Sequence, residues 1–148
     1  MEQRCKLPIS VQLLLNKDSK FLLQRRFNTG YEDGNYSFVG GHKEKNEEII
    51  EAMIREAKEE IGIEIDYGDL KVVEILHRKT EYDEYIDFII EANRWKGSPE
   101  ILEKDKCDEL VWVDKNNIPN NIIPFVKDVL NDYINNKKNI YKPYGWTS

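Results

Sequence analysis

One stretch of the sequence decides the fold: residues 41–63 read GHKEKNEEIIEAMIREAKEEIGI. Its apolar residues recur at the three- and four-residue spacing of an amphipathic helix. They are Ile49, Ile50, Met53, Ile54, Ala57 and Ile61. We expect a helix over residues 47–61, with Asn46 as its N-cap and Gly62 in the left-handed conformation that ends it. One face of this helix would pack on a core.

Three carboxylates share one edge of this predicted helix. Glu59 and Glu60 follow Glu56 by three and four residues, so the three side chains project within about 100° of one another. Like charges at this spacing repel each other, and an oxygen-seeking cation such as Mg²⁺ offsets the repulsion. The cluster alone has a simpler interpretation, because charge-rich faces are common on solvated helices. The residues around the cluster favour a metal site for phosphoryl chemistry.

The whole stretch resembles the Nudix box, a glycine, five residues, a glutamate, seven residues and then Arg-Glu-U-x-Glu-Glu-x-Gly-U, where U is a bulky aliphatic residue. The matching positions are Gly41, Glu47, Arg55, Glu56, Glu59, Glu60, Gly62 and Ile63. Two positions depart from the pattern, since Ala57 is smaller than the usual U residue and Val39 stands where many members have proline. Neither departure removes a carboxylate.

The resemblance implies a role for each box residue. Glu59 and Glu60 would be metal ligands, and Glu56 would be either a ligand or the base that activates water. Gly41 would offer its backbone carbonyl to the metal. Arg55 would act in catalysis by orienting a carboxylate. The implied cofactor is Mg²⁺, for which Mn²⁺ can substitute.

Glu47 would mainly support the loop and the start of the helix. Family members often recruit one more carboxylate from outside the box, and the candidates in this sequence are Asp105, Asp108 and Glu109. The general base is therefore left open among these residues and Glu56.

The resemblance to MutT-type Nudix domains extends to Arg25-Arg26, to Gly40-Gly41 and to residues 106–112. We expect Arg25, Arg26 and Asp105 at the substrate, because guanidinium groups suit phosphate oxygens. Neighbours on a strand face opposite ways, so one of the two arginines points elsewhere. The resemblance covers most of the chain and implies the α/β class, as an α/β/α sandwich with a mixed β-sheet.

The rest of the pattern is compatible with that architecture. Apolar runs bounded by turn residues predict strands; these are residues 9–15, 21–24, 36–39, 70–78, 85–92 and 110–113. Pro124 suits the first turn of a last helix, whose core-facing stripe would be Val126, Val129, Leu130, Tyr133 and Ile134. Aromatic residues in the tail, 141–146, suggest that it docks on the body. We expect one domain over residues 1–148.

Composition excludes several classes of partner. The formal charge is −6 and no basic cluster is visible, which argues against a nucleic acid polymer. No apolar run approaches the roughly 20 residues that span a bilayer, and the first residues lack a secretory core, so a cytoplasmic location is expected. Cys5 and Cys107 are expected to be free thiols. The sequence leaves the oligomeric state open between a monomer and a homodimer.

Three functions remain for this reading. The first is a MutT-type pyrophosphohydrolase that converts a nucleoside triphosphate to a monophosphate and pyrophosphate. The second is hydrolysis of ADP-ribose or a nucleotide sugar, because the same box would serve that bond. The third is a Nudix-fold module that senses a nucleotide without cleaving it, against which the intact carboxylate set argues.

Overall fold

The computed structural model describes residues 3–137 and 140–146, and these residues form eight strands, two α-helices and one short 3-10 helix. The strands are β1 (Ile9–Lys17), β2 (Lys20–Arg26), β3 (Tyr36–Ser37), β4 (Val39–His42), β5 (Lys71–Lys79), β6 (Glu84–Ala92), β7 (Cys107–Asp114) and β8 (Tyr141–Tyr144). The helices are α1 (Ile49–Ile61), the 3-10 helix η1 (Tyr67–Asp69) and α2 (Pro124–Ile134).

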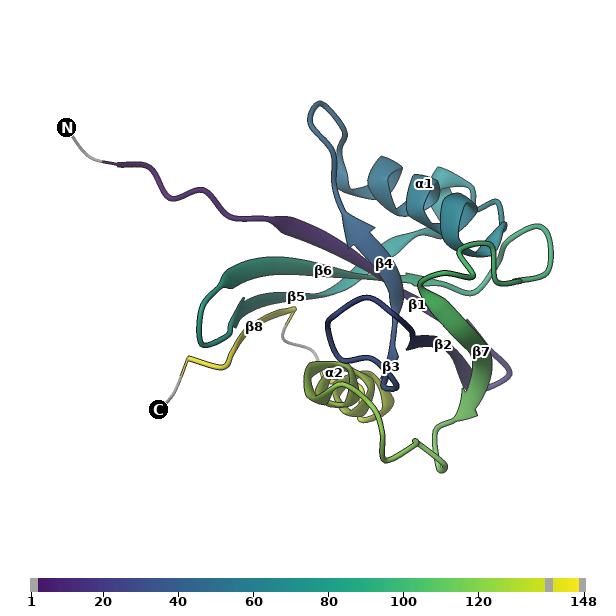
Figure 1. Ribbon diagram of the computed structural model, residues 1–148. Helices are drawn as coiled ribbons and strands as arrows, with labels where there is room; N and C mark the ends of the chain where they lie inside the picture. The colour runs from purple at the N-terminus through teal and green to yellow at the C-terminus, as the bar shows by residue number, and fades with distance from the viewer. Residues whose placement is uncertain (1–2, 138–139, 147–148) are drawn as a thin grey trace.

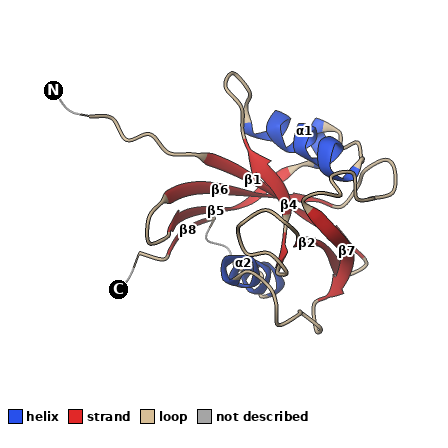
Figure 2. Cartoon of the chain, in the orientation of Figure 1, coloured by secondary structure: helices blue, strands red, loops and turns tan. Residues whose placement is uncertain are grey.

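The strands form one mixed sheet in the order β3-β2-β1-β6-β5-β8, with β4 on β1 and β7 on β2. Two pairs are parallel, β1 with β6 and β5 with β8, while the other pairs are antiparallel. Strand β1 pairs with β2, β4 and β6. It therefore connects the part of the sheet formed by β2, β3 and β7 to the part formed by β5, β6 and β8. Figures 1 and 2 show that the sheet is strongly twisted.

The two α-helices cover opposite faces of the sheet (Figure 1). Residues of α1, including Ala52 and Met53, pack on Val11 and Leu13 of β1. The stripe predicted for α2 packs on the other face, against Leu14 and its neighbours. Because β1 is buried on both faces, its sequence reads as a nearly continuous apolar run. The predicted α/β/α sandwich with a mixed sheet is confirmed.

The start of α1 differs from the prediction. The helix begins at Ile49, and its N-cap is Glu48, whose side chain accepts a hydrogen bond from Ile50 N while Glu51 accepts one from Glu48 N. Asn46 is therefore wrong as the cap. It has a φ of 65°, and such left-handed turn residues are often asparagine. Gly62 ends the helix with a φ of 71°, as expected.

Two predicted strands have different extents in the structure. Residues 36–39 were expected as one strand, but the pairing is interrupted at Phe38, where β3 ends before β4 starts. Strand β4 then continues through Gly40 and Gly41 to His42, paired with β1. The strand expected at residues 110–113 is longer in the structure, where β7 spans Cys107–Asp114. It is longer because it pairs with β2 from Lys20 to Arg26.

The tail docks on the body as predicted. Residues of β8 pair in parallel with Ile75–Arg78 of β5. Trp146 donates a hydrogen bond from Nε1 to the His77 carbonyl at 2.7 Å, and its ring centroid lies 4.6 Å from that of His77. Lys142 forms ion pairs with Asp128 and Asp132 of α2, so β8 is tied to both the sheet and the helix.

A polar network is buried between the sheet and α2. Asp87 of β6 is fully buried and accepts hydrogen bonds from Ser10 Oγ at 2.5 Å and Arg78 Nε at 2.6 Å. The Arg78 guanidinium lies 4.4 Å from the ring centroids of both Tyr85 and Phe125. Residues from β1, β5, β6 and α2 thus meet at one ion pair.

Glu74 of β5 is a second buried carboxyl group on this side. It is 6% exposed, and its Oε1 has no hydrogen-bond partner among the described residues. Burial, followed by the negative charge of Asp132, raises the pKa of Glu74 to about 8. The folded protein therefore binds a proton at Glu74 that the unfolded chain releases at ordinary carboxyl values.

This proton makes stability depend on pH. The free energy of unfolding should fall as pH rises from about 4.5 to about 8, because the proton on Glu74 stabilises the folded state fully only below its ordinary pKa and this contribution is lost as pH rises to the folded value. Glu74→Gln should flatten this fall, as measured by urea denaturation across that range. Glu81→Gln, at an exposed residue, is the matched control. An unchanged slope in Glu74→Gln would contradict the assignment.

The cysteines agree with the expectation of free thiols. Cys5 is exposed, Cys107 is buried, and both are free thiols. Among residues 3–137 and 140–146, no helix has the length and apolar character needed to cross a bilayer.

Candidate active site

Two adjacent glycines place α1 against the sheet. A Cβ atom on Gly40 would lie 2.2 Å from the Val11 carbonyl oxygen, so the backbones of β4 and β1 approach closely there. A Cβ atom on Gly41 would lie 2.6 Å from the carboxyl carbon of Glu56. The missing side chain at Gly41 therefore leaves the space that the Glu56 carboxylate fills.

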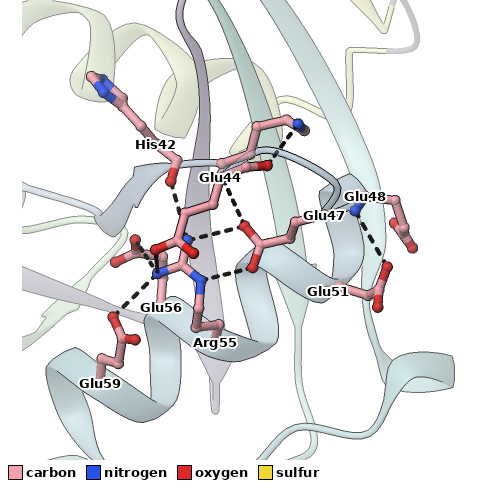
Figure 3. A network of polar contacts seen from close by, with 9 residues as sticks. His42, Glu44, Glu47, Glu48, Glu51, Arg55, Glu56 and Glu59 are labelled. Atoms are coloured by element: carbon pink, nitrogen blue, oxygen red, sulfur yellow. Dashed lines mark hydrogen bonds and ion pairs between the residues drawn. The ribbon is translucent and has the colours of Figure 1, made fainter.

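Arg55 is the centre of the polar network in Figure 3. Its guanidinium hydrogen-bonds Glu47 Oε2 at 2.7 Å, Glu47 Oε1 at 3.1 Å, Glu56 Oε1 at 2.9 Å, Glu59 Oε2 at 3.2 Å and the His42 carbonyl at 3.2 Å. The first of these partners, Glu47, contributes most to raising the pKa of Arg55. One guanidinium thus links the loop before α1 to two carboxylates on the helix.

Glu47 holds the loop in place. Its carboxylate takes two bonds from Arg55 and a third from the Glu44 backbone N–H at 2.8 Å. The hydrogen bond from Arg55 is also the main reason that the pKa of Glu47 is lowered. The left-handed turn at Asn46 brings the chain back so that Glu47 can face Arg55.

The three helix carboxylates lie in different environments. Glu59 is 56% exposed at its side chain and contacts Arg55. Glu56 is mostly buried, which raises its pKa, although Arg55 opposes the shift. Glu60 is buried more deeply, and its Oε2 has no hydrogen-bond partner among the described residues. Burial, then the charges of Glu56 and Glu103, raises the pKa of Glu60 to about 9.

These environments fit a divalent cation. A carboxylate oxygen that is buried without a donor costs free energy unless a proton or a cation satisfies it. Glu60 Oε2 is such an atom, and it lies beside Glu56, which fills the space over Gly41. Glu56 and Glu59 point to Arg55 (Figure 3). In the described part of the chain no three acidic, histidine or cysteine side chains meet closely enough to hold a metal as they stand.

Glu103 is a candidate that the sequence did not single out. Its loop is fixed to the end of α1, because the Leu102 N–H donates to the Glu60 carbonyl at 3.1 Å. Its negative charge is close enough to raise the pKa of Glu60. The sequence carries no signal for it, since the loop from Glu100 to Asp105 contains three acidic residues without periodic spacing.

The arginines at the end of β2 have protein partners. Arg25 binds Asp108 through Nε at 2.8 Å and NH2 at 3.1 Å, and it pairs with Glu109 at 3.4 Å. This contact lowers the pKa of Asp108. Glu109 also accepts a hydrogen bond from the Tyr36 hydroxyl at 2.8 Å. Asp108 and Glu109 therefore lie with Arg25 rather than beside the helix carboxylates.

Arg26 faces the loop that follows β2. Its Nε donates to the Tyr31 carbonyl at 2.7 Å, and its guanidinium lies 5.1 Å from the Tyr31 ring centroid. Asp105 is exposed on the loop before β7. Substrate contacts for Arg25, Arg26 and Asp105 stay predictions.

The fold and the site together define an α/β protein with a carboxylate site on a loop and helix packed over a glycine pair. Residues 7–133 match the model of the NUDIX domain. The chain therefore belongs to the Nudix family, and it is a Nudix hydrolase. Enzymes of this family typically use divalent metal ions.

Individual relatives agree with this membership. CTP pyrophosphohydrolase of Escherichia coli (strain K12) is 36% identical over 59 residues, which are 40% of this chain and 44% of that protein. The match thus spans less than half of that relative's length. The MutT NUDIX hydrolase from Burkholderia pseudomallei has a TM-score of 0.79 at 20% identity, covering 85% of this chain and 97% of that one. The MutT protein from Methanosarcina mazei Go1 has a TM-score of 0.77 at 20% identity, covering 93% and 100%.

The adjacent glycines should respond differently to alanine. Gly41→Ala should displace the Glu56 carboxylate and lower turnover at least about tenfold, since small displacements at reacting groups are costly. Its unfolding free energy should change by less than about 1 kcal/mol, because a flexible side chain can move. Gly40→Ala meets the Val11 carbonyl and should cost about 2 kcal/mol in stability. Kinetics and urea denaturation of both variants test this, and equal stability losses would contradict it.

Proposed function

We propose that the chain is a MutT-type, Mg²⁺-dependent pyrophosphohydrolase that converts a nucleoside triphosphate to a nucleoside monophosphate and pyrophosphate. The observation that carries the proposal is the buried Glu60 carboxylate beside Glu56 and Glu103, whose Oε2 has no hydrogen-bond partner in the part of the chain that the structure describes. Such a site favours a hard divalent cation, and Mg²⁺ commonly joins carboxylates to substrate phosphates. Mn²⁺ should substitute for it.

The matched relatives favour a triphosphate over the alternatives. A curated relative is named CTP pyrophosphohydrolase, and the matched structures include MutT proteins. Hydrolysis of ADP-ribose or a nucleotide sugar is the second candidate, because the box would serve either bond. These names describe the relatives. The substrate panel below assigns the substrate and the leaving group of this chain, and variants of the carboxylates assign its base.

Each box residue has a part in the reaction. Glu59 and Glu60 would hold Mg²⁺ together with the Gly41 carbonyl, and the metal would neutralise phosphate charge when bound. Water attacks a phosphorus atom and the phosphoanhydride P–O bond breaks, with the electron pair leaving on the bridging oxygen. Glu56 would be a ligand or the base that takes the proton from this water, and Arg55 would keep the Glu56 carboxylate oriented through their hydrogen bond.

Glu103 is the additional carboxylate outside the box. Its charge acts on Glu60 and its ion pair with Lys106 is long, at 3.8 Å, whereas Arg25 holds Asp108 at 2.8 Å and Glu109 at 3.4 Å. We therefore favour Glu103 over those two residues as a further ligand or as the base. For Arg25 to bind a phosphate, it would exchange Asp108 for the substrate.

A substrate panel tests the proposed function. The full chain is incubated with canonical and oxidised nucleoside triphosphates, ADP-ribose and nucleotide sugars, with Mg²⁺ or Mn²⁺, and the products are separated by chromatography. A monophosphate and pyrophosphate from a triphosphate support the proposal. Preferential cleavage of ADP-ribose or a nucleotide sugar assigns the second candidate. Tight nucleotide binding without turnover of any compound would instead identify a sensing module.

Arg55→Lys should lower turnover roughly tenfold or more, an effect typical of residues that orient metal ligands. A lysine ammonium cannot reproduce the planar fork that reaches Glu47, Glu56 and Glu59 at once. Steady-state kinetics at saturating Mg²⁺ measures the loss, and circular dichroism verifies folding.

The conservative change separates two roles for Arg55. If Arg55 is only a charged residue on the solvent-facing side of the helix, Arg55→Lys keeps the charge and turnover stays unchanged. Lys58→Arg, at an exposed position on the same helix, is the matched control and should leave turnover unchanged. A loss confined to Arg55→Lys supports a positioning role.

A further inference from the structure

A cavity lies at the end of the sheet where β1, β6 and β7 finish. Its volume is about 540 Å³, within the range of small-molecule sites. Its lining includes Lys17, Phe21, Arg94, Lys115, Asn16 and Tyr133. These residues come from the β1–β2 hairpin, from the segments after β6 and β7, and from the end of α2.

Three cations of this cavity have no ion-pair partner among residues 3–137 and 140–146. Lys17, Arg94 and Lys115 are exposed, and each comes from a different segment of the chain. None of them belongs to the ion pairs of the described residues, whereas Arg25, Arg55, Arg78 and Lys142 all do. Three unpaired positive charges around one cavity contrast with a chain whose formal charge is −6.

Two carboxylates, Glu91 and Asp18, lie at or beside the cavity. Glu91 accepts a short hydrogen bond from the Tyr133 hydroxyl. The Tyr133 hydroxyl oxygen in turn accepts a hydrogen bond from Asn16 Nδ2 at 3.1 Å. Asp18 also lines the cavity. Three cations against Asp18 and Glu91 leave an excess of one positive charge, and each of the three cations can bind a separate oxygen of a phosphorylated ligand.

The Lys17 side of the cavity lies far along β1 from Gly41. Val11 of β1 pairs with Gly41, and Lys17 lies six residues farther along the same strand. At roughly 3.3 Å per residue, this places Lys17 about 20 Å from the strand position beside Gly41. Lys17 is therefore remote from a ligand held at Gly41, and none of the ion pairs of Glu56 and Glu59 among the described residues involves Lys17, Arg94 or Lys115.

We propose that this cavity binds a small phosphorylated anion. Ammonium and guanidinium groups are the usual protein partners of phosphate, and the rings of Phe21 and Tyr133 provide an apolar wall beside them. Three separate cationic groups favour a ligand with several phosphate oxygens, such as a diphosphate, over a monoatomic anion such as chloride. Inorganic pyrophosphate is the simplest probe of this class. The inference does not depend on which substrate the carboxylate site cleaves.

Binding of pyrophosphate to the full chain tests the proposal. The titration is done at low salt with excess EDTA, so that no divalent cation can recruit pyrophosphate to Glu56 and Glu60. Calorimetry gives the affinity, and amide chemical shifts in two-dimensional NMR locate the site. We expect millimolar or tighter binding, with shifts at the β1–β2 hairpin and around Arg94 and Lys115.

Two triple variants with the same loss of charge distinguish the cavity from general attraction. The combination Lys17→Gln, Arg94→Gln, Lys115→Gln should weaken binding at least about tenfold, because phosphate affinity depends on each neutralised charge. The control is Arg4→Gln, Lys71→Gln, Lys127→Gln, at exposed residues elsewhere, and it should stay within about threefold of the unsubstituted chain.

Three results would overturn the proposal. They are no binding at millimolar pyrophosphate, equal weakening in the two triple variants, and chemical shift changes centred on α1 instead of the cavity. Circular dichroism of both variants shows whether folding is kept, and the exposed positions make its loss unexpected. A substrate panel without turnover would refute the proposed function and leave this binding result unaffected.

Discussion

Glu60→Gln is expected to lower turnover at least about a hundredfold, because it removes a negative charge from the proposed metal site. Glu59→Gln should have a comparable effect. Glu60 is the more informative position, since its Oε2 is buried and has no hydrogen-bond partner among residues 3–137 and 140–146. Saturation with Mg²⁺ should not restore the rate, whereas a variant that merely weakened metal affinity would recover.

The same substitution should stabilise the metal-free protein. With its pKa raised to about 9, Glu60 must take up a proton when the metal-free protein folds near neutral pH, and an uncharged amide removes that cost. Urea denaturation in EDTA should show a higher unfolding free energy, by about 1 kcal/mol. Activity and stability thus change in opposite directions, which simple misfolding cannot produce.

A matched control completes the experiment. Glu81→Gln removes the same charge at an exposed residue in the β5–β6 turn and should change neither property. Near-normal turnover in both Glu59→Gln and Glu60→Gln would refute the metal assignment.

Asp87→Ala should lower the free energy of unfolding by about 3–5 kcal/mol, the usual cost of leaving one partner of a buried ion pair without its counter-charge. Asp87 is fully buried, and Arg78 reaches it with two donors. The guanidinium is enclosed by Tyr85 and Phe125, so it cannot easily turn to solvent. Equilibrium denaturation in urea gives the value directly.

Removing both charges distinguishes the ion pair from packing. The double variant Arg78→Met, Asp87→Leu should recover much of the loss, because well-packed apolar residues can replace a buried pair at little cost. Ser10→Ala should cost about 1 kcal/mol, the effect of one hydrogen bond to the carboxylate. A loss below 1 kcal/mol in Asp87→Ala would show that the pair is hydrated in solution.

Regular periodicity made most of the elements predictable. The apolar spacing of α1 and α2 and the short strands reflect burial on a sheet face, which the side-chain pattern records directly. The start of α1 was harder to predict from the sequence, because the side chains of both Asn46 and Glu48 can accept hydrogen bonds from backbone N–H groups. Tertiary contacts of Glu47 with Arg55 decide between them, and no local propensity contains that information.

The candidate site was predictable only where residues share a helix. Spacing placed Glu56, Glu59 and Glu60 on one edge and Arg55 beside it. Long-range contacts were not accessible in the same way. Neither the engagement of Arg25 by Asp108 nor the approach of Glu103 follows from sequence distance, since both depend on how the segment before β7 returns to the sheet.

The late position of β8 in the chain affects how the protein is made. Strand β5 is synthesised well before residues 141–144, so a growing chain leaves the backbone N–H and C=O groups of Ile75–Arg78 open along one edge. Open strand edges pair readily with other chains. Completion of β8, closed by Lys142 on α2 and Trp146 on His77, removes this edge. Chains released before residue 141 should therefore aggregate during expression, even though every residue of the carboxylate site is present in them.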